Sequence, residues 1–130
     1  MSTPSPPSIL AVEDNRETQL LLQHLLESSF HVVVADGVES ALAAAEEHRF
    51  DVLLLDINLS ERRTGIDLLH LLRKQDKHRQ APAVALTAYA MPGDREKFIE
   101  EGFDAYISKP FSREDLKTII ESALRSERPA

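Results

Sequence analysis

Five short apolar runs and the amphipathic stretches between them define the pattern of this chain. Each run is four or five residues long, the length of a strand covered on both faces in a parallel sheet. The stretches that follow have apolar residues three and four positions apart, which indicates helices packed by one face. The runs are Ser8–Val12, His31–Ala35, Val52–Leu55, Ala83–Thr87 and Ala105–Ser108.

Local signals place the five predicted helices. Asn15 is a suitable N-cap for the first, which we expect to end near Ser28 and Ser29. The fourth opens at Pro92–Asp94 and ends at Gly102, a residue suited to the left-handed position past a helix end. Ser112 and Asp115 resemble a capping box for the fifth. The segment 74–80 is predicted to be a charged connection. The apolar stripes of helices 1, 2, 3 and 5 contain, in that order, Thr18, Leu21, Leu22, Leu25 and Leu26; Val38, Ala41, Leu42 and Ala45; Ile66, Leu69 and Leu72; and Leu116, Ile119, Ile120, Ala123 and Leu124.

Strands that alternate with helices predict an α/β fold with a parallel sheet covered on both faces. Each strand–helix–strand crossover should be right-handed. The economical arrangement is a doubly wound, flavodoxin-like sheet in the order 2-1-3-4-5, in which the strand order reverses between strands 1 and 3. Ligands of such sheets bind outside the carboxyl ends of the strands near that point.

Composition limits the class of protein. A chain of 130 residues with 42% hydrophobic and 28% charged residues is expected to form one globular domain, which we place at 8–126 between a disordered lead-in (1–7) and a short tail (127–130). A formal charge of −7 argues against nucleic-acid binding. The sequence contains no cysteine, no membrane-length apolar run and no secretion signal, so we expect a soluble, cytoplasmic protein without disulfides or membrane association.

Polar residues at the ends of the predicted strands form the candidate site. Glu13 and Asp14 follow strand 1, Asp56 follows strand 3, and Thr87 and Lys109 end strands 4 and 5. In the predicted topology these residues share one edge of the sheet, where three crowded carboxylates raise one another's pKa unless a cation lies among them. Hard oxygen ligands suit Mg²⁺, for which Mn²⁺ could substitute. A carboxylate beside a metal, a lysine and a hydroxyl is an arrangement for phosphoryl transfer.

Each of these residues also has a purely structural interpretation. A strand-ending Asp56 can cap the next helix, and Glu13 and Asp14 can form a solvated turn favoured by the helix dipole. Thr87 suits any strand end, and Lys109 can be an ordinary surface lysine. Their joint placement at one edge favours the site.

The motifs in this pattern resemble those of the response-regulator receiver domain of bacterial two-component signalling. The similarity covers roughly residues 8 to 125 and rests on Val-Glu-Asp-Asn at 12–15, Leu-Asp-Ile-Asn at 55–58, Leu-Thr-Ala at 86–88 and Ser-Lys-Pro-Phe at 108–111. It implies that Asp56 is the phosphorylated aspartate and Asp14 a direct Mg²⁺ ligand. Glu13 would act mainly through metal-bound water, and the backbone carbonyl of Asn58 would be a further ligand.

The same resemblance implies the switch residues. Thr87 would be the hydroxyl that closes on the phosphoryl group, and Lys109 would be its counter-ion. Tyr106 matches the aromatic residue that changes rotamer when Thr87 moves. The peptide bond between Lys109 and Pro110, at the mouth of the site, is usually cis in the family.

Two features depart from the family pattern. In the family, the loop after Asp56 usually has a proline four residues on; here it has Ser60 followed by Glu61, Arg62 and Arg63, and it is about one residue longer. Tyr89, two residues beyond Thr87, places a bulky side chain at the mouth of the site. We predict that Tyr89 hinders the hydrolytic water and prolongs the phosphorylated state.

The expected function is that of a stand-alone receiver. It would take a phosphoryl group from a partner histidine kinase or histidine phosphotransfer protein, because none of its five histidines lies in the predicted crevice. It would catalyse its own phosphorylation and dephosphorylation, without being an enzyme acting on a separate substrate. The output would be binding of a downstream protein, or onward relay of phosphate, by the face built from helix 4, strand 5 and helix 5. On that face Phe103 and Phe111 are candidates, with core packing as their alternative. The protein would be a monomer or a phosphorylation-dependent dimer.

Two rival functions differ in class. A phosphorylation-independent interaction module would keep the fold without the chemistry, and the intact polar set argues against it. A nucleotide-binding or flavin-binding domain, or a Mg²⁺-dependent phosphatase, is disfavoured because no glycine-rich loop follows strand 1 and Glu13 and Asp14 would repel an anion there.

Overall fold

A five-stranded parallel sheet forms the centre of the molecule, as seen in the computed structural model, which describes residues 6–88 and 91–125. The strand order is β2-β1-β3-β4-β5, so the predicted doubly wound topology is confirmed. Register joins Val12 of β1 to Leu55 of β3, and Asp56 of β3 to Leu86 of β4. The strands are β1 (Ser8–Val12), β2 (His31–Ala35), β3 (Val52–Asp56), β4 (Ala83–Thr87) and β5 (Ala105–Ser108).

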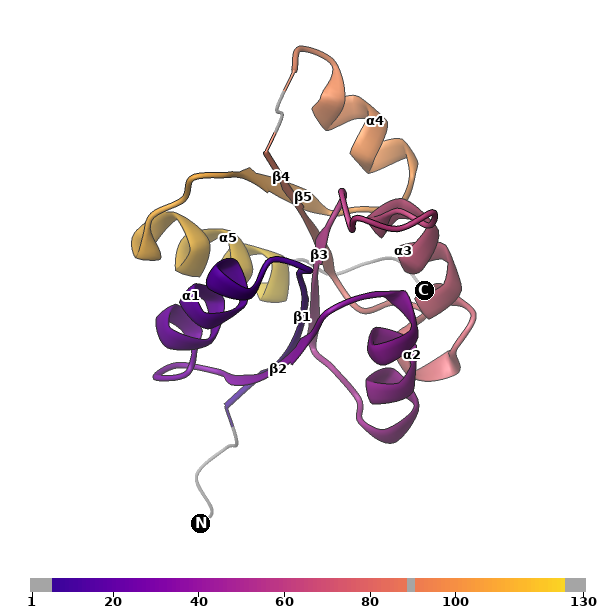
Figure 1. Ribbon diagram of the computed structural model, residues 1–130, viewed down its shortest axis with the longest axis horizontal. Helices are drawn as coiled ribbons and strands as arrows, with labels where there is room; N and C mark the ends of the chain where they lie inside the picture. Colours follow the sequence, from indigo (N-terminus) through magenta and orange to yellow (C-terminus); the bar gives the residue numbers. More distant parts are fainter. Residues whose placement is uncertain (1–5, 89–90, 126–130) are drawn as a thin grey trace.

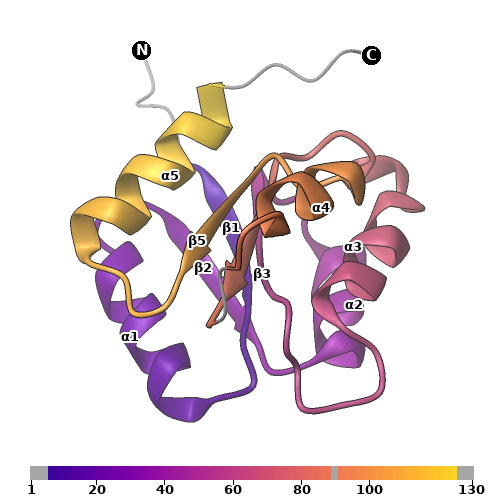
Figure 2. The same ribbon diagram turned by 90° about the horizontal axis from the view of Figure 1, so that it is seen from above.

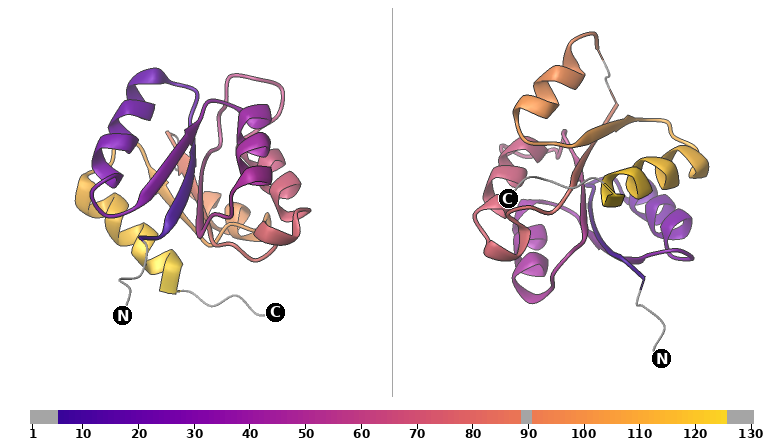
Figure 3. Two further views of the ribbon diagram at one scale, coloured as in Figure 1. Left: turned by 90° about the horizontal axis from the view of Figure 1, so that it is seen from below. Right: turned by 180° about the vertical axis from the view of Figure 1, so that it is seen from behind.

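Helices cover both faces of this sheet. Figure 1 shows α1 and α5 on one side and α2 and α3 on the other, with α4 near the edge formed by β5. The same separation is visible from above in Figure 2 and from below and behind in Figure 3. The helices are α1 (Arg16–Leu26), α2 (Val38–Glu47), α3 (Gly65–Arg73), α4 (Asp94–Glu100) and α5 (Arg113–Arg125), with one 3₁₀ helix, η1 (Asp76–His78), before β4.

Two apolar clusters hold these layers together, one on each face. β3 and β4 are buried along their whole length, which explains why each is aliphatic up to the polar residue that ends it. Alternate residues of each strand point to opposite faces, so Leu53 and Leu55 pack toward α2 and α3 while Leu54 packs toward α1 and α5. Phe103, a candidate for the partner-binding face, is instead a core residue with 2% exposure.

The first helix is shorter than predicted. It ends at Leu26, with Glu27 as its C-cap, rather than near Ser28 and Ser29. Leu22 and Leu26 lie one turn apart and are buried, whereas Leu21 is 44% exposed. The apolar spacing therefore predicted a wider buried stripe on α1 than the structure has, since it included Leu21.

The segment 74–80, predicted to be a charged connection, contains a short 3₁₀ helix that its composition did not indicate. η1 ends with His78, whose side chain is fully buried. The backbone N–H of Phe50 donates to His78 Nε2 at 3.1 Å, and His78 Nδ1 lies 3.0 Å from Gln75 Oε1. The imidazole thus joins this connection to the segment that enters β3.

Side-chain caps fix where α1, α3 and α5 begin. Asn15 accepts from the Thr18 N–H at 3.0 Å, and Ser112 accepts from the Asp115 N–H at 3.0 Å, as the sequence predicted. α3 has a reciprocal capping box between Thr64 and Asp67. Gly102 has a φ of 113°, the left-handed conformation expected after α4. Within the described ranges no helix combines the length and the apolar character needed to cross a bilayer.

Candidate functional site

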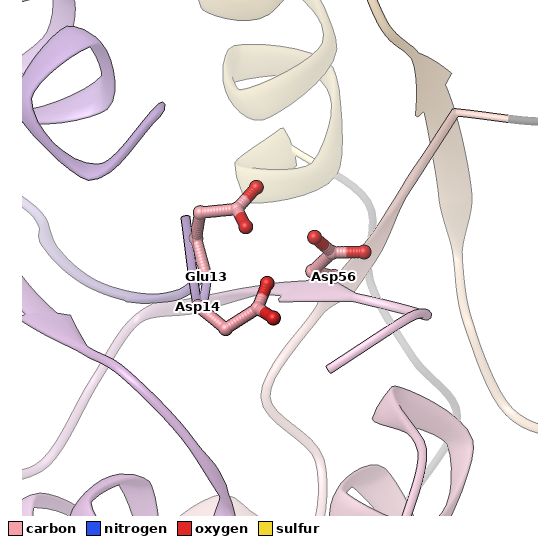
Figure 4. Close-up of side chains that lie close together, drawn as sticks. All are labelled: Glu13, Asp14 and Asp56. Atoms are coloured by element: carbon pink, nitrogen blue, oxygen red, sulfur yellow. The ribbon is translucent and has the colours of Figure 1, made fainter. Parts of the chain in front are cut away.

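Three carboxylates meet at the carboxyl edge of the two neighbouring strands β1 and β3. Glu13 and Asp14 directly follow β1, and Asp56 is the last residue of β3. Each contributes a carboxylate oxygen, and these oxygens lie within 4.8 Å of one another. Figure 4 shows the three side chains turned toward a common centre. The sequence therefore predicted this juxtaposition correctly, because parallel strands end at the same edge.

Glu13 is the most buried of the three. Its side chain is inaccessible to solvent, and this burial raises the pKa of Glu13 to about 7, against the lowering effect of a hydrogen bond from Lys109. The Asn15 N–H donates to Glu13 Oε2 at 2.9 Å, and Gln19 Nε2 donates to the Glu13 carbonyl at 2.7 Å. These contacts hold the first turn of α1 against the end of β1.

Asp14 is more open and behaves in the opposite way. Partial burial alone would raise its pKa, but hydrogen bonds, above all one from the Ser60 hydroxyl, hold the pKa of Asp14 below its ordinary value. Asp14 is therefore ionised at neutral pH and faces the cluster from its half-exposed side.

Lys109 is the cation of the site. Its Nζ donates to Glu13 Oε1 at 2.6 Å and to Asp56 Oδ2 at 2.9 Å. Burial would lower the pKa of Lys109, yet the two carboxylates outweigh it and raise that pKa. The backbone holds this side chain in place, since the Lys109 N–H donates to the Thr87 carbonyl at 2.7 Å. The peptide bond from Lys109 to Pro110 is cis.

Asp56 is 2% exposed, and both of its carboxylate oxygens accept hydrogen bonds. Oδ2 accepts from Lys109, and Oδ1 accepts from the Asn58 N–H at 2.9 Å. Asn58 itself is exposed. The loop after β3 thus turns back over Asp56 and places a backbone segment beside the carboxylate cluster.

The remaining predicted residues lie at the same edge or on the face next to it. Thr87 is 2% exposed and follows Leu86, the partner of Asp56 in the sheet. Tyr106 is half-buried, with its ring centroid 6.1 Å from that of Phe98. Tyr106 and the exposed Pro110 line an open hollow of about 720 Å³ between α4, β5 and α5. Tyr89 lies outside the described residues.

The loop at 60–63 supplies contacts that the sequence did not reveal. Glu61 Oε2 accepts from the Val38 N–H at 3.2 Å, at the start of α2. Arg63 Nη2 lies 2.7 Å from Glu39 Oε1. The sequence marked this loop as a departure from the family pattern, but nothing in the residue spacing indicated that it contacts α2.

The charge balance of this cluster suits a divalent ion. When all three acids are ionised, Lys109 offsets one of three negative charges. Burial of the surplus charge is unfavourable, as the raised pKa of Glu13 indicates. Closely spaced hard oxygen atoms, with access for water beside Asp14 and Asn58, match the preferences of Mg²⁺.

Comparison with known proteins identifies the family to which this sequence is related. The family model described as "Response regulator receiver domain" matches residues 9–121. The polar-differentiation response regulator DivK of Brucella anthropi is 41% identical over 109 residues, covering 82% of this chain and 87% of DivK. DivK of Brucella ovis is 39% identical over 107 residues, covering 81% and 85%.

Solved structures share the same architecture. The chemotaxis response regulator CheY4 of Vibrio cholerae superposes with a TM-score of 0.86 at 27% identity, covering 92% of this chain and 99% of CheY4. The receiver domain of the sensor histidine kinase PA1611 from Pseudomonas aeruginosa has a TM-score of 0.83 at 33% identity, covering 94% of this chain and 100% of that domain. That structure contains a magnesium ion coordinated in the active-site cleft. The family model, these relatives and the geometry of the carboxylate edge all agree. The chain therefore belongs to the response regulator receiver domain family of two-component signalling.

Proposed function

We propose that Asp56 accepts a phosphoryl group from a phosphohistidine on a partner histidine kinase or histidine phosphotransfer protein. One observation carries this proposal: Asp56 is a buried strand-end carboxylate held 2.9 Å from Lys109 and within 4.8 Å of two further acids. A carboxylate in such surroundings has a fixed orientation and a cation beside the position that an incoming phosphoryl group would take.

The proposed transfer is a single displacement at phosphorus. A carboxylate oxygen of Asp56 forms a bond to phosphorus as the bond from phosphorus to the imidazole nitrogen of the donor breaks, and the bonding electrons return to that nitrogen. Lys109 then pairs with an oxygen of the transferred group, and Thr87 donates its hydroxyl to another. Hydrolysis of the acyl phosphate by water restores Asp56, so the domain returns to its starting state without acting on a separate substrate.

A divalent cation fits the same cluster. We infer that carboxylates of Glu13, Asp14 and Asp56 and the backbone carbonyl of Asn58 hold Mg²⁺ or Mn²⁺, with Glu13 acting mainly through bound water. When bound, the ion would neutralise charge on the phosphoryl oxygens. The magnesium in the PA1611 receiver supports this assignment by similarity.

The signal would leave the domain through the face around Tyr106. Phosphorylation adds charge at Asp56, Thr87 moves toward that charge, and Tyr106 repacks in response. Tyr106 suits this role because it lies between the apolar contact with Phe98 and the open hollow beside α5. The output would be binding of a downstream protein, or onward relay of phosphate, by the domain at 8–126, in a cytoplasmic setting and as a monomer or a phosphorylation-dependent dimer.

Phosphorylation with a small donor tests the proposal directly. Incubation with acetyl phosphate and Mg²⁺ should add the mass of one phosphoryl group, and the Asp56→Asn variant should remain unlabelled. Asp76→Asn, an exposed acid on η1, is the matched control and should label like the wild type. Undiminished labelling of Asp56→Asn, or absence of any label on the wild type with every donor tried, would contradict the assignment.

The proposed role of Tyr89 has its own test. If its side chain shields the acyl phosphate from water, Tyr89→Ala should shorten the lifetime of the phosphorylated protein. The lifetime is measured as loss of label after removal of the donor. An unchanged rate of dephosphorylation would show that Tyr89 does not control access of water.

A further inference from the structure

The start of α2 is capped by a residue from the loop after Asp56. The N-cap of α2 is Gly37, which has no side chain to accept from the free N–H groups of the first turn. The carboxylate of Glu61 takes this place, since its Oε2 accepts from the Val38 N–H at 3.2 Å. A negative charge is also favoured at a helix N-terminus. The loop at 60–63 therefore supplies the acceptor that α2 lacks.

The missing side chain at Gly37 is also what allows Glu61 to approach. A Cβ added at Gly37 would lie 2.7 Å from Glu61 Oε2, too close for the two atoms to keep their positions. The backbone at Gly37 is extended, with φ of −173°, and does not itself require glycine. Gly37 is thus matched to Glu61 by space rather than by backbone conformation.

Further contacts fasten the same loop on both sides of Ser60. Leu59 is 2% exposed and belongs to the apolar cluster that includes Val38. Arg63 Nη2 lies 2.7 Å from Glu39 Oε1, in the first turn of α2. Between them, Ser60 has a φ of 29°, a conformation that is unfavourable for a residue with a Cβ and persists where surrounding contacts impose it. The loop is therefore held firmly against α2.

This loop begins at the residue that orients Asp56. The Asn58 N–H donates to Asp56 Oδ1 at 2.9 Å, and Lys109 Nζ donates to Oδ2 at 2.9 Å. A donor on each oxygen fixes the carboxylate, and a displacement of about 1 Å at a reacting group can slow a reaction about a hundredfold. Asn58 itself is exposed, so the position of its N–H depends on how firmly the loop that follows is held.

We propose that Glu61 is a positioning residue for the acceptor aspartate: by capping α2 it holds the loop whose Asn58 N–H orients the carboxylate of Asp56 for attack on phosphorus. This inference rests on the proposed function in one respect, namely that Asp56 accepts the phosphoryl group. It extends that proposal to α2 and to the loop that departs from the family pattern.

Two substitutions at Glu61 separate the cap from the charge. Glu61→Ala removes both, whereas Glu61→Gln removes the charge and keeps an acceptor for the Val38 N–H. Labelling of Glu61→Ala by acetyl phosphate should be about two- to fivefold slower than that of the wild type, the factor that corresponds to a charge at a helix N-terminus. Glu61→Gln should recover part of the rate. Glu47→Ala, exposed in the last turn of α2, is the matched control and should label like the wild type.

Gly37→Ala tests the same contact without changing any charge. The added Cβ displaces the flexible end of Glu61, so labelling should slow by a similar factor. In the double variant Gly37→Ala/Glu61→Ala the two effects should not add, because the contact is already lost in either single variant. Additive slowing would mean that the two residues act independently, and it would contradict the inference.

NMR of the metal-free variants supplies a measurement that a loss of stability alone would not change. In Glu61→Ala and Gly37→Ala the amide proton resonances of Val38 and Asn58 should both shift upfield, toward the values of amides without a hydrogen bond. Leu124→Ala is the stability control, since Leu124 is partly buried in the apolar cluster on the other face of the sheet. It should lower Tm and leave the Asn58 resonance and the labelling rate unchanged.

The two measurements together decide the matter. Slower labelling by Glu61→Ala than by Glu61→Gln, with a shifted Asn58 resonance, supports the inference. Wild-type labelling by Glu61→Ala overturns it and leaves the proposed function intact, because Leu59 would then suffice to hold the loop. Slower labelling with an unmoved Asn58 resonance also overturns it, because the effect would not pass through the donor to Asp56. Absence of label on the wild type would overturn the inference and the proposed function together.

Discussion

Glu13 is a buried acid in a position that destabilises the metal-free protein. Its pKa is raised from 4.5 to about 7 by burial, so the folded state holds its proton more tightly than the unfolded chain does. Stability is therefore highest below the unfolded pKa and is lost as the pH rises from 4.5 toward 7. Above pH 7 it is lower by roughly 3 kcal/mol, the cost of ionising the buried group.

The Glu13→Gln variant should therefore be more stable than the wild type in EDTA at alkaline pH. Glutamine carries no charge, but its single carbonyl oxygen can accept from Lys109 or from the Asn15 N–H and not from both, which offsets about 1 kcal/mol of the gain. We expect a net gain of about 1 to 2 kcal/mol in the free energy of unfolding, which disappears at acidic pH. Urea unfolding at several pH values measures it. Glu47→Gln is the exposed control, and an equal gain there would refute the role of burial.

His78 should give the protein an acid-sensitive stability of the opposite sign. Burial, with the nearby charges of Lys77, Arg49 and Arg73, holds the pKa of His78 below 6.5. The unfolded chain thus takes up a proton first, and stability is lost as the pH falls below about 6.5. Protonation also removes the acceptor that Nε2 offers to the Phe50 N–H.

The comparison that isolates His78 is a difference in pH dependence. From about pH 7 to pH 5, the wild type should lose stability relative to His78→Gln by up to about 1.4 kcal/mol per pH unit. Glu13 contributes the opposite slope in both proteins and cancels in the difference. The exposed His31 supplies the control, His31→Gln. Parallel pH profiles for wild type and His78→Gln would show that the buried imidazole is not responsible.

Sequence spacing could predict the acids at the strand ends but not the residues that support them. Glu13, Asp14 and Asp56 follow apolar runs, and the ends of parallel strands meet wherever the sheet order places them side by side. The burial of His78 depends on Phe50, which is 28 residues away in the sequence. The contact of Glu61 with the Val38 N–H depends on a loop conformation that no periodicity encodes.

At the scale of elements, the start of α3 and the end of β3 are packed too closely for any side chain between them. A Cβ added at Gly65 would lie 2.1 Å from the carbonyl oxygen of Asp56. The Gly65 N–H also donates to the Ile57 carbonyl at 3.0 Å, so the two backbones cannot separate without losing that bond. Glycine at this position thus allows α3 to begin directly beneath the candidate phosphorylation site.

Gly65→Ala should accordingly damage both stability and phosphorylation. The clash is with backbone rather than with a flexible side chain, so we expect a loss of about 2 kcal/mol or more. Acetyl phosphate labelling should slow because Asp56 is displaced. Thermal unfolding and labelling rates measure the two effects. Thr64→Ala, which removes the neighbouring cap, should cost about 1 kcal/mol and leave labelling nearly unchanged; equal labelling rates in Gly65→Ala and wild type would contradict the argument.

Element types were predictable because each has a strong local signal, whereas their ends and buried faces were not. The strands are short runs rich in aliphatic residues, and Asn15 and Ser112 cap helices where the sequence indicated. The first helix ends at Leu26, with Glu27 as its C-cap, and Leu21 is exposed because the sheet covers a narrower stripe of the helix than the apolar spacing suggested. These outcomes depend on tertiary packing, which adds to local preference.

For the whole molecule, the order of the strands places negative charge at one edge. The formal charge of the chain is −7. Three of its acidic side chains lie with carboxylate oxygens within 4.8 Å of one another, and Lys109 is the cation beside them. This topology was predictable from the alternation of strands and helices. The face that would bind a partner was less so, because Phe103 is in the core and Tyr106 is half-buried against Phe98.

A specific cation should consequently stabilise the folded molecule more than salt does. An ion that binds the native cluster and not the unfolded chain raises the free energy of unfolding by RT ln(1 + [L]/Kd), or about 1.4 kcal/mol when its concentration is tenfold above Kd. MgCl₂ should therefore raise Tm beyond the effect of NaCl at equal ionic strength, and Asp14→Asn should lose most of that increment. Exposed charges elsewhere are screened alike by both salts. Equal Tm values in the two salts would mean that the carboxylates do not form a cation site, since screening alone would then account for the response.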